Sequence, residues 1–114
     1  RVQSYSKGMR QKIGLMGTML TGCHLFILDE PMSGLDPRAR ALVKKMLLDM
    51  KSHDDTIFLS SHVLADMDEI CDRVALLHNC EIQFIGKPAE LKTMMNVDNL
   101  EQAFLEFIEC RDAA

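Results

Sequence analysis

Several features are scarce or absent in this 114-residue sequence. It has no tryptophan, one tyrosine and five phenylalanines but nine methionines, which predicts an adaptable core filled by aliphatic and methionine side chains. The four cysteines form no C-x-x-C pair, which disfavours a standard zinc site and favours reduced thiols in a cytosolic protein. No apolar run approaches the roughly 20 residues that a membrane-spanning helix requires.

The overall composition is that of a folded domain. Hydrophobic residues make up 47% of the chain and charged residues 26%, which argues against disorder, and the length suits one domain. The net charge is −4, so a protein that coats nucleic-acid phosphates is disfavoured. A site for a few phosphates remains possible, because backbone N–H donors do not contribute to net charge.

Short apolar runs alternate with amphipathic segments along most of the chain. A helical pattern runs from Ser6 to Gly22, and Asp36-Pro37 predicts the start of a second helix, with Asp36 as its N-cap. We expect buried strands over 25–28 and 56–60, a third strand over 74–78, and a half-exposed antiparallel strand over 81–85. Further helices are expected over 37–52, 64–70, 89–95 and 100–110.

The order strand, helix, strand, helix, strand predicts an α/β fold with a parallel sheet and flanking helices. In such sheets ligands bind beyond the carboxyl ends of the strands. Asp29 and Glu30 follow the first strand, and Ser61-His62 follows the second. We therefore expect these polar groups to converge at one edge of the sheet.

Two adjacent carboxylates at the end of a buried strand need a partner for their charge. Asp29 can hold Mg²⁺, which prefers oxygen ligands and keeps part of its water shell. Glu30 is then available to polarise a water for attack on a phosphoryl group. The alternative is a surface turn with solvated acids, which the preceding apolar run and the following Pro-x-Ser-Gly-Leu-Asp disfavour.

Four segments together resemble motifs of a known family. LFILDE, at 25–30, resembles a Walker B strand with its catalytic glutamate, and SGLD, at 33–36, resembles a D-loop. SSH, at 60–62, resembles a switch-histidine segment, and YSKGMRQK, at 5–12, resembles a variant LSGGQ signature. In order and spacing the whole chain resembles the C-terminal half of the ATP-binding domain of an ABC transporter, a P-loop NTPase fold.

The resemblance implies roles for individual residues. Asp29 would position Mg²⁺, Glu30 would orient and deprotonate the attacking water, and His62 would contact the terminal phosphate of ATP. Asp36 would act across the interface of an ATPase dimer, although a plain N-cap is the alternative for an aspartate at that position.

The signature segment would bind ATP held mainly by the other subunit. Ser6, Lys7 and Gly8 lie at a predicted helix N-terminus, where backbone N–H groups and the helix dipole favour an anion. The segment departs from LSGGQ at Tyr5, Lys7 and Met9. Signatures of this kind resemble those of bacterial exporter ATPases that pair with separate membrane subunits.

The phosphate-binding loop of this family, G-x-x-x-x-G-K-[ST], occurs nowhere in the 114 residues. We expect that loop upstream of residue 1, and we expect this chain alone neither to hydrolyse ATP nor to stay fully soluble. The implied whole is an ATPase subunit with a second ATPase subunit and a transmembrane permease as partners, peripheral on the cytoplasmic side of the cell membrane.

Two alternatives belong to other functional classes. One is a non-transport ATPase of the same superfamily, acting in DNA repair or translation, against which the switch histidine and the acidic balance weigh. The other is a non-catalytic half-cassette that serves only for binding, against which the intact acids and histidine weigh.

Overall fold

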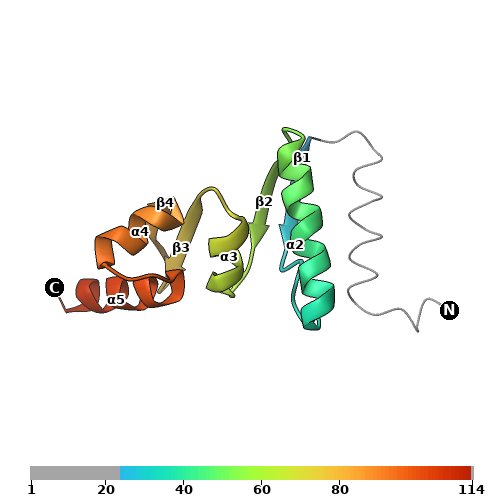
Figure 1. Cartoon of the computed structure of the whole chain (residues 1–114). Coiled ribbons are helices and arrows are strands. Elements are labelled where there is room, and N and C mark those ends of the chain that lie inside the picture. The colour runs from blue at the N-terminus through green and yellow to red at the C-terminus, as the bar shows by residue number, and fades with distance from the viewer. Residues whose placement is uncertain (1–23, 114) are drawn as a thin grey trace. The chain divides into compact units, whose positions relative to one another are not determined.

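The computed structural model describes residues 24–113 (Figure 1). Its contacts divide the chain into two compact units. The first unit ends at His62 and the second begins at Val63. The described elements follow the predicted order and are β1 (Leu25–Asp29), α2 (Pro37–Ser52), β2 (Thr56–Ser60), α3 (Leu64–Ile70), β3 (Val74–His78), β4 (Glu81–Gly86), α4 (Pro88–Met95) and α5 (Leu100–Asp112). The helix expected between Ser6 and Gly22 lies outside the described residues.

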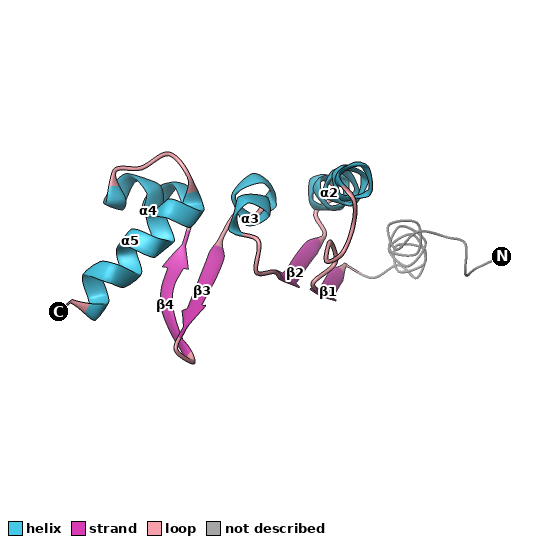
Figure 2. Ribbon diagram, turned by 90° about the horizontal axis from the view of Figure 1, so that it is seen from below, coloured by secondary structure: helices cyan, strands magenta, loops and turns pink. Residues whose placement is uncertain are grey.

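In the first unit, β1 and β2 pair in parallel, as predicted, with Leu25 opposite Thr56 and Asp29 opposite Ser60. The connection between them is α2, which packs against β2 (Figure 2). Side chains on β1, on the turn that follows it and on α2 supply the core among residues 24–62: Phe26, Met32, Val43, Leu47 and Met50. The in-register pairing brings the carboxyl ends of both strands to one edge.

The start of α2 also follows the prediction. Asp36 is the N-cap, its Oδ1 accepts a hydrogen bond from the Ala39 N–H at 2.8 Å, and Pro37 is the first helical residue. Asp36 caps an N-terminal donor that has no partner within the helix, while proline lacks an N–H to satisfy.

The expectation that the first two strands are fully buried is wrong. Leu25, Ile27 and Phe58 are 59%, 75% and 69% exposed. Residues in a strand alternate between the two faces of the sheet. Among residues 24–62, α2 is the only helix, and it covers the face to which Phe26 points. The alternate side chains of β1 and their neighbours on β2 therefore remain exposed.

The second unit combines a β-hairpin with three helices. β3 and β4 pair antiparallel, so β4 has the predicted direction, while the parallel arrangement expected for three strands is observed for β1 and β2. On α5, Phe107 packs edge-on against Phe84 of β4, and Arg111 donates a hydrogen bond to the Gln83 carbonyl at 2.9 Å. The apolar stripe of α5 thus packs within its own unit.

Candidate functional site

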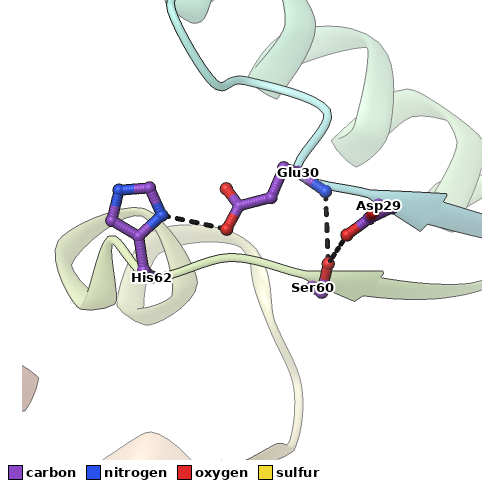
Figure 3. A network of polar contacts seen from close by, with 4 residues as sticks. All are labelled: Asp29, Glu30, Ser60 and His62. Atoms are coloured by element: carbon purple, nitrogen blue, oxygen red, sulfur yellow. Dashed lines mark hydrogen bonds and ion pairs between the residues drawn. The ribbon is translucent and has the colours of Figure 1, made fainter.

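The candidate site lies at the carboxyl ends of β1 and β2, within the first unit. Asp29 is the last residue of β1, Ser60 is the last residue of β2, and the two are paired across the sheet. Directly opposed residues on neighbouring strands project to the same face. The side chains of Asp29 and Ser60 therefore meet (Figure 3).

The Ser60 hydroxyl connects the two adjacent acids. Its Oγ donates a hydrogen bond to Asp29 Oδ1 at 2.6 Å and accepts one from the Glu30 N–H at 3.2 Å. The Ser60 carbonyl oxygen also accepts from the Glu30 N–H, at 3.1 Å. Ser60 thus contacts Asp29 through its hydroxyl, and Glu30 through both its hydroxyl and its backbone carbonyl.

Glu30 adopts an uncommon backbone conformation that turns its side chain away from the strand. Its φ is +48°, a region that non-glycine residues rarely occupy, and the following Pro31 further restricts it. Glu30 is held by its N–H bonds to Ser60 and by a hydrogen bond from the Ser33 N–H to its carbonyl at 3.2 Å. Such strained residues cluster at functional sites and persist only where the surrounding contacts fix them.

His62 contacts the side chain of Glu30. The two groups are 2.9 Å apart, from His62 Nδ1 to Glu30 Oε1. The imidazole is 76% exposed and the carboxylate 35%, so both remain accessible to a ligand from solvent. The predicted convergence of Asp29, Glu30 and His62 at one edge is therefore observed as geometry, with Glu30 bonded to His62 and Asp29 bonded to Ser60.

The side chains of this site could hold Mg²⁺ only together with further ligands, such as water and phosphate oxygens. Across residues 24–113, no three His, Cys, Asp or Glu side chains gather closely enough to form a metal site by themselves. Mg²⁺ usually keeps several waters and is bound by one or two carboxylates together with substrate phosphates. Asp29 fits that role, because it is exposed and only one of its two carboxylate oxygens bonds to Ser60.

The remaining predicted site residues are placed less fully. Asp36 caps α2 at the end of the turn that follows Glu30, which is a sufficient structural role for its side chain. Ser6, Lys7 and Gly8 lie outside the described residues. Ser60 was predicted only as part of the SSH segment, and its contact with Asp29 could have been anticipated from the parallel register of the two strands.

Known proteins resemble this chain over most of its length. No protein-family model matches the sequence. An uncharacterized ABC transporter ATP-binding protein of Synechocystis is 43% identical over 91 residues, which cover 80% of this chain and 26% of that protein. A fluoroquinolones export ATP-binding protein of Mycobacterium tuberculosis is 41% identical over 91 residues, covering 80% of this chain and 30% of that protein.

A solved structure of the ATP-binding subunit of an ABC transporter matches with a TM-score of 0.75 at 30% identity, over 93% of this chain and 45% of that one. The chain belongs to the ABC transporter ATP-binding protein family. Its fold is accordingly that of part of the ABC ATPase domain, a P-loop NTPase fold. The chain spans 26% and 30% of the lengths of the two curated relatives above.

Among the described residues, no helix is both long enough and apolar enough to cross a membrane.

Proposed function

We propose that the protein to which this chain belongs is the ATP-hydrolysing subunit of an ABC transporter, and that Glu30, Asp29 and His62 form part of its active site. One observation carries the proposal: the 2.9 Å contact between His62 and Glu30, next to Asp29, at the ends of two parallel strands. This arrangement brings a candidate base, a candidate metal ligand and a candidate phosphate ligand to one edge of the sheet.

Glu30 is suited to orient a water and accept its proton. A carboxylate has two oxygens, so the contact of Oε1 with His62 leaves Oε2 to bind water. An ionised carboxylate is only an acceptor, which requires that Nδ1 of His62 carries the proton of that hydrogen bond. His62 can then donate to a phosphate through Nε2 as an imidazolium, or through Nδ1 after it releases Glu30.

Asp29 would bind Mg²⁺ together with ATP phosphates and water. When bound, the ion neutralises charge that develops on the phosphoryl oxygens. The contribution of this chain is an exposed carboxylate whose Oδ1 accepts a hydrogen bond from the Ser60 hydroxyl.

The remaining assignments concern a second subunit. Ser6, Lys7 and Gly8 would contact ATP bound mainly by that subunit, and Asp36 would lie at the interface between the two. ATP-dependent closure of two such domains would drive a transmembrane permease, with the ATPase peripheral on the cytoplasmic side of the membrane. The name of the Mycobacterium relative supports export as the direction of transport.

The test is ATP hydrolysis by the full-length subunit and its Glu30→Gln variant. Loss of a general base typically lowers the rate by about 10²–10⁴-fold, and we expect a loss in that range with ATP binding retained. Glu81→Gln is the matched control, because Glu81 is an exposed glutamate of β4. A Glu30→Gln rate equal to that of Glu81→Gln would contradict the proposal.

We further propose that these 114 residues alone do not hydrolyse ATP. They contain no G-x-x-x-x-G-K-[ST] loop, whose backbone N–H groups and lysine bind the phosphates and whose hydroxyl binds Mg²⁺. Phosphate release from the isolated chain should therefore equal that of its Glu30→Gln variant. A steady excess in the unsubstituted chain would contradict this proposal.

A further inference from the structure

The Ser60 hydroxyl is the only side-chain group in the described part of the site that contacts both consecutive acids (Figure 3). It uses its single proton on Asp29 Oδ1, at 2.6 Å, and a lone pair on the Glu30 N–H, at 3.2 Å. Bonds between a hydroxyl and an ionised carboxylate are the shorter and stronger kind of hydrogen bond. The hydroxyl is therefore well placed to fix the orientation of Asp29.

We infer that Ser60 is a positioning residue, which orients the Asp29 carboxylate toward Mg²⁺ bound with ATP. The inference rests on the function proposed above and extends it to a residue outside the acids and the histidine. With Oδ1 of Asp29 held by Ser60, the carboxylate cannot rotate freely, and its other oxygen is available to the metal. Such supporting hydrogen bonds commonly tune metal affinity.

The two hydrogen bonds of the Ser60 hydroxyl differ in whether another group can replace them. The Glu30 N–H also bonds to the Ser60 carbonyl oxygen at 3.1 Å, so it keeps an acceptor when the side chain is changed. Asp29 Oδ1, by contrast, receives its hydrogen bond from the hydroxyl itself. Loss of the hydroxyl should therefore weaken the Mg²⁺ contribution to ATP binding more than it disturbs Glu30.

The informative pair of variants is Ser60→Val and Ser60→Thr. Valine and threonine are both β-branched and suit a strand end, and they differ by a methyl group in place of a hydroxyl. Ser60→Ala serves as a smaller second variant without the hydroxyl. Ser52→Ala is the remote control, because Ser52 bonds to the Asp49 carbonyl at the end of α2.

The experiment measures ATP binding by the full-length subunit in a Glu30→Gln background, once with EDTA and once with saturating Mg²⁺. We expect Ser60→Val and Ser60→Ala to lower the Mg²⁺-dependent gain in affinity by about three- to tenfold, the size of one lost hydrogen bond of typical net strength at an exposed site. Ser60→Thr and Ser52→Ala should retain the gain, and affinity in EDTA should be the same for all variants.

A second readout uses hydrolysis with Glu30 intact. The Mg²⁺ concentration for half-maximal rate should rise in Ser60→Val and Ser60→Ala, while kcat at saturating Mg²⁺ should change by less than about threefold, because the Glu30 N–H keeps the Ser60 carbonyl. A loss of protein stability alone would not produce this division between metal affinity and rate.

The outcomes separate this inference from the proposed function. Equal Mg²⁺-dependent gains for Ser60→Val and Ser60→Thr, with the gain abolished by Asp29→Asn, would overturn the role of Ser60 and leave the ATPase proposal intact. A loss of the gain in both of these Ser60 variants would also overturn it, because the hydroxyl would then not be the cause. If Asp29→Asn and Glu30→Gln were both without effect, both proposals would fall.

Discussion

Asp36 offers a test that separates a structural role from a functional one. Its carboxylate caps α2 through a 2.8 Å hydrogen bond from the Ala39 N–H, and the first turn of that helix contains no acidic residue that could replace it. Asp36→Ala should therefore destabilise the protein by about 1 kcal/mol, the usual cost of losing an N-cap side chain. In a domain of 150–250 residues this corresponds to a fall in Tm of roughly 2–4 °C.

Asp36→Asn should behave differently, because asparagine caps helices about as well as aspartate. Its Tm should stay within about 1–2 °C of the unsubstituted protein, since only the smaller charge–dipole interaction is lost. If the charge of Asp36 also acts at the interface of an ATPase dimer, Asp36→Asn should still weaken ATP-dependent dimerisation. Melting by circular dichroism and sedimentation of the full-length subunit with ATP measure the two effects separately.

The matched control is Asn99→Ala at the start of α5. Asn99 is also an N-cap, and its side chain accepts a hydrogen bond from the Gln102 N–H at 2.7 Å. It should lower Tm about as much as Asp36→Ala does, without changing dimerisation. An Asp36→Asn protein with both normal Tm and normal dimerisation would refute the interface role and leave Asp36 as an N-cap only.

Three further predictions concern the buried core, an ion pair and the exposed face of β1. Met50→Ala should cost about 2–5 kcal/mol by chemical denaturation, because Met50 is fully buried, whereas Met94→Ala, at an exposed position, should cost less than about 0.5 kcal/mol. Lys92→Met should cost about 0.5–1 kcal/mol at low salt and less at high salt, because it removes a 2.8 Å ion pair with Asp68. Ile27→Thr should reduce self-association of the isolated chain in sedimentation experiments, and an unsubstituted chain that remains monomeric would contradict this.

The order of the described elements, and their bounds to within two residues, could be predicted because local signals agree with the tertiary structure. Asp36-Pro37 combines a capping side chain with a residue that needs no N–H partner, and α2 begins there. The antiparallel direction of β4 follows from the tight turn at Asn79 and Cys80, both of which have positive φ. Such short-range chemistry is contained within a few residues, so a single sequence reveals it.

The exposure of the strands could not be predicted in the same way. An apolar run such as Leu25–Leu28 indicates that a strand has two apolar faces, and it does not say what covers each face. On one face Phe26 is buried and Leu28 half-buried, whereas Leu25 and Ile27 on the other face are exposed. Burial depends on which segments pack against a strand, and that is a property of the tertiary structure.

The geometry of the site explains how two adjacent carboxylates acquire separate partners. Alternation along β1 directs Asp29 to the exposed face, where Ser60 lies directly opposite on β2. A regular strand would direct the next side chain to the other face, but the positive φ of Glu30 ends the strand and lets its carboxylate reach His62. The two charges are thus oriented by different groups, one by a hydroxyl and one by an imidazole. Under the proposed function, that separation would let Asp29 face Mg²⁺ while Glu30 faces water, which adjacent residues in a regular strand could not do from one side of the sheet.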